Sequence, residues 1–201
     1  MNYQRPSGIS RTQTSVSHSR FICIISQASS VTEAREFIGK IRAEMPDASH
    51  HVYAFRVGFG NTIIEGMSDD GEPSGTAGPP LLAVLRGTNL GDIVMVVVRY
   101  FGGTKLGTGG LVRAYTESAQ EGLQNISTEY NITKKTLGVD IPYSLYEQIK
   151  RLIHTHEGLI EDEFFEGQIT LILKMPAYNV QIFETNLTEL TNGQIGIVQF
   201  D

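Results

Sequence analysis

Two glycine-rich stretches hold most of the residues whose types and spacing could do chemistry. The first, SDDGEPSGTAG at residues 68–78, contains three carboxylates: Asp69, Asp70 and Glu72. Carboxylates so placed could hold magnesium, which accepts one or two of them together with waters and substrate phosphates. The stretch is equally rich in turn-forming pairs, and Ser74 or Thr76 could cap the helix that the next residues predict. Composition favours the turn-and-cap interpretation, and magnesium is the alternative.

The second stretch, RYFGGTKLGTGGL at residues 99–111, joins a predicted strand to a predicted helix. A glycine-rich loop that enters a helix collects free backbone amides at the positive end of the helix dipole, which is the physical basis of an anion site. Lys105 and Arg113 would add full positive charge. The spacing departs from the phosphate-binding loop at Thr108 and from the dinucleotide fingerprint at Val112. A tight strand-to-helix crossing and an anion or RNA phosphate contact are therefore the two interpretations.

These stretches, with two residues from neighbouring predicted strands, supply the candidate binding residues. They are Arg20, His50, Asp69, Asp70, Gly71, Glu72, Arg99, Gly102, Gly103, Lys105, Gly107, Thr108, Gly109, Gly110 and Arg113. No catalytic residue is assigned, because the sequence pairs no base with Ser68 or Ser74. No metal ligand or cofactor is predicted either, since the adjacent His50 and His51 point to opposite faces of a strand.

Composition and charge narrow the class of protein. With 201 residues, of which 40% are hydrophobic, the chain can build a sizeable core. The longest aliphatic run, residues 93–98, is far shorter than the ~20 residues that cross a bilayer, so no membrane contact is expected. The first eighteen residues lack the apolar segment of a signal peptide, which predicts a cytoplasmic protein.

The net charge of −6 is unevenly placed along the chain. Lys and Arg number 11 against 11 Asp and Glu through residue 123, and 5 against 11 from residue 124 onward. Phosphate binding depends on clustered Lys and Arg. The last third is therefore not expected to bind nucleic acid broadly.

Apolar periodicity and turn residues predict two domains joined by a linker. Domain one, residues 1–123, has predicted strands at 21–26, 51–57, 62–65 and 92–100 and predicted helices at 31–45, 76–85 and 111–123. Residues 124–133 are polar and unperiodic and are expected to form the linker. Residues 134–201 show the order βαββαβ, which predicts a ferredoxin-like plait with two helices on one face of four antiparallel strands. The predicted class is α+β.

The order and spacing of five motifs resemble the IMPACT family, specifically its bacterial YigZ-like members. The motifs lie within roughly residues 18–123 and are SRFI at 19–22, PDASHH at 46–51, SDDGEPSGTAG at 68–78, VRYFGG at 98–103 and LGTGGLVRAY at 106–115. The predicted C-terminal plait is similar to the second domain of the same bacterial proteins.

This resemblance implies both a fold and a function. It implies an N-terminal domain like domain 2 of ribosomal protein five and the fourth domain of elongation factor G, and a C-terminal domain like that factor's third or fifth domain. It further implies a cytosolic, non-enzymatic regulatory protein, associated with translation, that binds RNA, the ribosome or a protein partner through the glycine-rich face. The alternative is a nucleotide- or phosphate-binding enzyme that uses the loop from Gly102 to Gly110 with Asp69 or Asp70 and magnesium.

Overall fold

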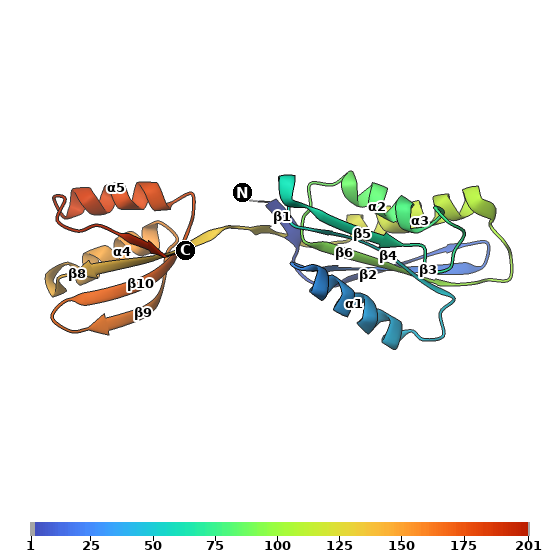
Figure 1. Ribbon diagram of the computed structural model, residues 1–201, viewed down its shortest axis with the longest axis horizontal. Coiled ribbons are helices and arrows are strands. Elements are labelled where there is room, and N and C mark those ends of the chain that lie inside the picture. The colour runs from blue at the N-terminus through green and yellow to red at the C-terminus, as the bar shows by residue number, and fades with distance from the viewer. Residues whose placement is uncertain (1–2, 201) are drawn as a thin grey trace. The chain divides into compact units, whose positions relative to one another are not determined.

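The computed structural model describes residues 3–200 of the chain. These residues form two compact units, 3–131 and 132–200 (Figure 1). The first unit contains two hydrophobic cores and the second contains one. Both units mix helices and strands, as the sequence predicts. None of the helices in the described residues combines the length and the hydropathy that a bilayer-spanning helix needs.

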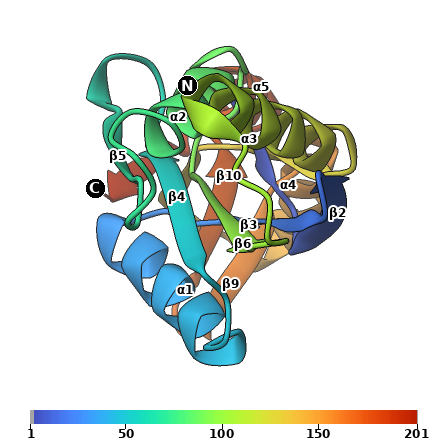
Figure 2. The ribbon, with the colours of Figure 1, turned by 90° about the vertical axis from the view of Figure 1, so that its right-hand side faces the viewer.

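The first unit is built around a five-stranded antiparallel sheet with helices on both faces. Its strand order is β2-β3-β6-β4-β5. In that order the strands are Ser10–Val16, Ser19–Gln27, Ile93–Tyr100, His50–Val57 and Ile64–Ser68, and the 3₁₀ turn η1 (Gly60–Thr62) lies between β4 and β5. One face is covered by α1 (Val31–Glu44), and the other by α2 (Gly78–Arg86) and α3 (Gly107–Gln124) (Figures 1 and 2).

The central strand β6 explains why this sheet needs helices on both faces. Seven of its eight residues, Ile93 to Arg99, are buried. A strand without a polar face must be covered on both sides. Alternate valines, such as Val94 and Val96, pack against α1, whereas Met95 and Val97 lie in the core beneath α2 and α3. The strand thus separates two cores.

Three strands of the first unit were not predicted from the sequence. These are the edge strand β2 and the pair β1 (Tyr3–Pro6) and β7 (Thr128–Asn131), which form a two-stranded antiparallel ribbon. Part of the expected linker, residues 128–131, therefore belongs to the first unit. The Asp92 carboxylate anchors the ribbon by accepting hydrogen bonds from the Tyr3 hydroxyl and the Asn131 amide. Polar side chains dominate these strands, so no apolar alternation marks them.

The second unit is a four-stranded antiparallel sheet with both helices on one face. Its strand order is β11-β8-β10-β9. The elements in chain order are β8 (Lys134–Ile141), η2 (Tyr143–Leu145), α4 (Tyr146–Thr155), β9 (Leu159–Phe165), β10 (Ile169–Pro176), α5 (Val180–Leu190) and β11 (Val198–Phe200). Residues of both helices share one core with alternate residues of β8 and β10, including Leu137 and Leu171. The predicted order βαββαβ is present, and the other sheet face is left without helices.

Candidate functional site

The two glycine-rich stretches meet at a cavity of about 340 Å³ at the start of α3. Its lining residues come from the loop before α2, the end of β6 and the loop and first turns of α3. They are Glu72, Pro73, Arg99, Phe101, Lys105, Leu106, Gly107, Thr108 and Leu111. The cavity has charged groups at one side and apolar side chains at the other.

A buried ion pair forms the charged side of the cavity. Arg99 Nη1 lies 2.6 Å from Glu72 Oε1, and the two side chains are only 6% and 3% exposed. The Tyr115 hydroxyl donates to the same carboxylate oxygen at 2.8 Å. Burial, followed by the negative charge of Glu72, raises the pKa of Tyr115 far above its usual value, so its proton stays on the hydroxyl. Glu72 is thus held by two donors from β6 and α3.

The same arginine connects this pair to the loop after β6. Its Nη2 donates to Ser19 Oγ at 3.4 Å, and that oxygen also accepts the Gly102 N–H at 3.1 Å. At Gly102 an added Cβ would lie 2.0 Å from the carbonyl carbon of His18, so the close backbone approach requires glycine. The third guanidinium nitrogen, Arg99 Nε, is buried, and its N–H has no hydrogen-bond partner among the described residues.

Asp69 does not line the cavity but caps α2 from outside the helix. Its carboxylate accepts the backbone N–H groups of Gly75, Ala77 and Gly78 at 2.8–2.9 Å. Burial alone would raise the pKa of Asp69, but the three amides outweigh it and lower the pKa. The expected cap by Ser74 or Thr76 was wrong. The helix begins at Gly78, and its N-cap residue Ala77 makes no side-chain hydrogen bond.

Asp70 does not line the cavity either, and its carboxylate is bonded to other parts of the protein. It forms an ion pair with Arg42 of α1 and accepts the backbone N–H of His51 at 2.6 Å. Its φ of 44° places it in the left-handed region, next to Gly71 at 85°. Both acids proposed for magnesium are therefore already bound to protein groups. In the described residues no group of three or more His, Cys, Asp and Glu side chains could hold a metal ion.

His50 contacts both Asp70, in the stretch of residues 68–78, and Glu72 of the buried ion pair. As the first residue of β4, it places Nδ1 2.8 Å from the Asp70 carbonyl oxygen and Nε2 3.8 Å from Glu72 Oε2. An added Cβ on Gly71 would lie 3.5 Å from His50 Nδ1, which is ordinary contact. The positive φ, rather than crowding, therefore favours glycine at this position.

The start of α3 carries no side-chain cap. Its N-cap residue is Leu106, whose side chain cannot accept a hydrogen bond from the first amides. Gly103 and Gly107 have positive φ values of 85° and 71°. An added Cβ on Gly109 would meet nothing within 4 Å, whereas one on Gly110 would lie 3.0 Å from Leu106 Cβ. The amides of the first turn are therefore bare, beside an open space.

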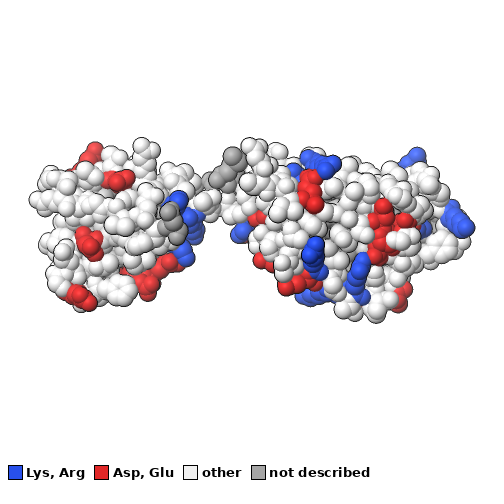
Figure 3. All heavy atoms as spheres, viewed as in Figure 1, with Lys and Arg blue, Asp and Glu red and all other residues white. Residues whose placement is uncertain are grey.

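The structure does not bring all the predicted cations into the cavity. Lys105 lines it and is exposed, while Arg113 lies on the exposed side of α3, and neither forms an ion pair with a described residue. Arg20 is exposed on β3 with its guanidinium 4.3 Å above the Tyr100 ring. Arg99 is buried and neutralised by Glu72. In the view of Figure 3, basic and acidic residues are interspersed over the first unit.

Sequence reasoning missed several residues of this cavity. Its apolar side is formed by Pro73, Phe101, Leu106 and Leu111, which carried no chemical signal in the sequence. Tyr115 lies in the helix predicted at 111–123, and it is fully buried. A buried tyrosine usually finds a hydrogen-bond partner for its hydroxyl, and that rule was the available signal.

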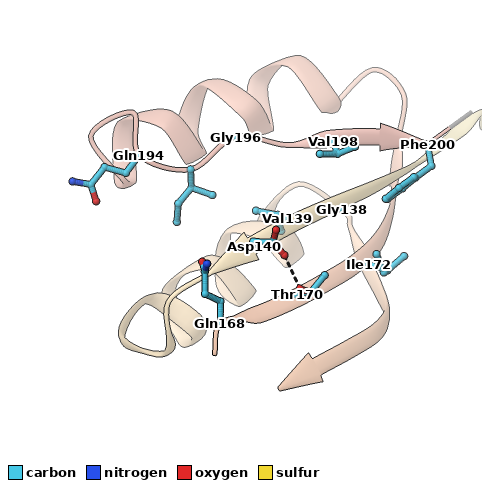
Figure 4. Close-up of a pocket in the computed structure, with 11 residues that line it drawn as sticks. Gly138, Val139, Asp140, Gln168, Thr170, Ile172, Gln194, Gly196, Val198 and Phe200 are labelled. Atoms are coloured by element: carbon cyan, nitrogen blue, oxygen red, sulfur yellow. Dashed lines mark hydrogen bonds between the residues drawn. The ribbon is translucent and has the colours of Figure 1, made fainter. Parts of the chain in front are cut away.

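The second unit contains a cavity of the same volume, about 340 Å³, with different chemistry (Figure 4). It lies on the helix-free side, between β8, β10 and the segment that leads to β11. Asp140 is the one charged residue that lines it, and its carboxylate accepts the Thr170 hydroxyl at 2.6 Å. The Phe200 ring covers Gly138, where an added Cβ would lie 2.8 Å from Cε2 of that ring.

Comparison with known proteins shows the family to which the chain belongs. The model of the Impact N-terminal domain matches residues 17–123, and a domain of unknown function (DUF1949) matches residues 139–194. The chain belongs to the IMPACT family. It is 38% identical to an IMPACT family member of Haemophilus influenzae over 90% of this chain and 89% of that protein, and 35% identical to IMPACT family member YigZ of Escherichia coli over 92% of both.

A Bacillus subtilis relative and a solved structure also match most of the chain. IMPACT family member YvyE of Bacillus subtilis is 37% identical over 90% of this chain and 83% of that protein. A crystal structure of a hypothetical protein is 34% identical, with a TM-score of 0.70, and the match covers 100% of this chain and 98% of that chain. The cavity at the start of α3 lies within the part that matches the Impact N-terminal domain.

Proposed function

We propose that this IMPACT family member is a cytosolic, non-enzymatic regulatory protein of translation that binds RNA, free or within the ribosome. The strand order of the second unit supports a ferredoxin-like plait similar to the third or fifth domain of elongation factor G. The first unit supports the resemblance to domain 2 of ribosomal protein five through its family match. In this proposal the glycine-rich face of the first unit holds RNA phosphates.

The uncapped start of α3 is the observation that carries the proposal. Bare first-turn amides and the helix dipole favour an anion there, and Lys105 lines the same cavity. Arg113 supplies a second exposed cation on the same helix. Arg99 takes a different role from the one expected, because its charge is already neutralised by Glu72. Phosphate contacts are therefore assigned to the amides, Lys105 and Arg113.

The second unit has a separate part in this proposal. It carries five Lys and Arg against ten Asp and Glu in residues 132–201, which repels phosphate. We therefore propose that any partner of this unit is a protein. The magnesium-dependent enzyme is the weaker alternative, because Asp69 and Asp70 are both held by other groups of the protein.

The test is RNA binding by the full chain in mobility-shift assays and ribosome sedimentation, at roughly 50 mM and roughly 200 mM salt. Binding should weaken with salt, and the double variant Lys105→Ala with Arg113→Ala should reduce both the affinity and the salt slope. The matched control is Arg35→Ala with Lys40→Ala, which removes two exposed cations from α1 on the opposite face of the sheet. Absence of binding at low salt, or equal loss in both double variants, would contradict the proposal.

A further inference from the structure

The cavity at the start of α3 has the size of a small-ligand site. Its volume of about 340 Å³ falls at the lower end of the roughly 300–1,000 Å³ that ligand pockets occupy. Proteins that bind a continuous RNA strand usually hold it along an open basic groove, whereas the charged residues that line this cavity are Lys105, Arg99 and Glu72 alone. The cavity therefore fits one nucleotide better than a run of phosphates.

Two kinds of free donor lie at this cavity. The first-turn amides of α3 are uncapped, and Lys105 lines the cavity with no ion-pair partner among the described residues. Arg99 also lines it, but its Nε is covered by protein atoms and its Nη1 is bonded to Glu72. The amides and Lys105 are therefore the donors that an anionic oxygen in this cavity can reach.

The other side of the cavity suits a flat, largely apolar body bearing a hydroxyl. Phe101 is 50% exposed and lines the cavity beside Leu106 and Leu111, so its ring offers a platform on which a base can stack. Glu72 lines it too, and its Oε2 lies 3.8 Å from His50 Nε2 but accepts no hydrogen bond from a described residue, whereas Arg99 and Tyr115 both donate to Oε1. A carboxylate oxygen of this kind is a good acceptor for a ribose hydroxyl.

We propose that this cavity binds a nucleotide through a terminal phosphate monoester, either a free mononucleotide or the phosphorylated 5′ end of an RNA. The phosphate lies on the first turn of α3 with Lys105, and the base lies against Phe101. This inference deepens the proposed function by naming the group that the same site recognises, and it rests on that function only where the nucleotide belongs to RNA.

The test titrates the full chain, by isothermal titration calorimetry, with the four ribonucleoside 5′-monophosphates, their nucleosides and inorganic phosphate. At least one monophosphate should bind roughly tenfold or more tightly than its nucleoside, because charge-assisted hydrogen bonds are the strong ones. Thr108→Glu should weaken that binding roughly a hundredfold by placing a carboxylate at the phosphate position, although an acid at a helix start does not harm the fold. Gln120→Glu adds the same charge to an exposed position of α3 and should leave the affinity unchanged.

The source of the nucleotide is decided by two oligoribonucleotides of one sequence, with a 5′-phosphate or a 5′-hydroxyl. Preference for the phosphorylated end identifies RNA as the source, whereas monophosphate binding without that preference identifies the free nucleotide. The inference is overturned if no monophosphate binds more tightly than its nucleoside, or if Thr108→Glu and Gln120→Glu behave alike. RNA binding that needs Lys105 and Arg113, combined with no monophosphate that binds more tightly than its nucleoside, overturns only this inference. Monophosphate binding without RNA binding overturns only the proposed function.

Discussion

The two units contain cavities of equal volume that are built on different principles. In the first unit, Glu72 and Arg99 are buried and bonded to each other in the wall of the cavity, and the start of a helix faces the same space. In the second unit, Asp140 lies exposed on the open face of a sheet, with the Thr170 hydroxyl as its partner. Equal volume therefore says little about function. The two cavities differ in whether the charged residues of their walls are buried.

The difference in burial predicts where substitution of a charged residue should lower the stability of the protein. Removing one partner of a buried ion pair leaves an uncompensated charge, whereas an exposed carboxylate is solvated by water in any case. The wall of the first cavity is thus tied to the stability of its unit. The wall of the second cavity should tolerate substitution.

The largest expected effect is that of Glu72→Ala. It should lower the free energy of unfolding by about 3–5 kcal/mol, because Arg99 is left buried without its counter-charge. Urea unfolding followed by circular dichroism measures this loss. The double variant Glu72→Leu with Arg99→Met should regain most of the stability, since removing both charges also removes their desolvation. No recovery in the double variant would show that shape, rather than charge, is what the pair supplies.

The next largest effects are expected from glycine substitutions, whose cost in stability should differ between the two units. Gly102→Ala should cost about 3 kcal/mol, at the upper end for overpacking, because its Cβ would lie 2.0 Å from backbone. Gly138→Ala in the second cavity should cost about 1 kcal/mol or less, because the contacting Phe200 ring is 45% exposed and can move. Gly109→Ala should raise stability by up to about 1 kcal/mol. Melting temperatures test this order, and Gly138→Ala as costly as Gly102→Ala would contradict it.

Asp69→Asn should change the response to acid. The pKa of Asp69 is lower in the folded protein than in the unfolded chain, so its contribution to stability is complete above the unfolded value of about 3.9. That contribution is lost as the pH falls through the lowered folded pKa. In the variant the charge is absent, so stability should be lower at neutral pH and fall less steeply below about pH 4. Parallel curves of unfolding free energy against pH for the two proteins would rule this out.

The smallest expected effect is that of Asp140→Ala. Loss of one exposed hydrogen bond to Thr170 should cost no more than about 1 kcal/mol. The affinity of the first unit for a nucleotide should not change, because Asp140 belongs to the other unit. Urea unfolding and calorimetry measure the two quantities. A loss approaching that of Glu72→Ala would remove the contrast between the cavities.

Elements with strong local signals could be predicted from the sequence. α1 (Val31–Glu44) agrees with the helix predicted at 31–45, and it begins after Ser30, whose hydroxyl accepts the Glu33 N–H at 3.1 Å. The apolar run of β6 is the buried centre of the first sheet, and β9 (Leu159–Phe165) is the second strand of the predicted order βαββαβ. These elements depend on neighbours in the chain, which a single sequence displays.

Features that depend on distant residues could not be predicted. The ribbon of β1 and β7 joins segments more than a hundred residues apart, held by Asp92. The cap of α2 comes from Asp69, eight and nine residues before the amides of Ala77 and Gly78, in place of the local hydroxyls. Neither partnership leaves a periodic trace in the sequence.

The sequence by itself determined the two-unit organisation, the βαββαβ order, the family and the placing of a glycine-rich loop before α3. Only the tertiary structure decided that the two glycine-rich stretches, residues 68–78 and 99–111, meet at one cavity. It also decided that Asp69 and Asp70 serve the backbone, and that Arg99 is neutralised by Glu72 rather than offered to a ligand as free charge. The physical reason is that charge acts through distance and burial, which are set by packing of residues far apart in the chain.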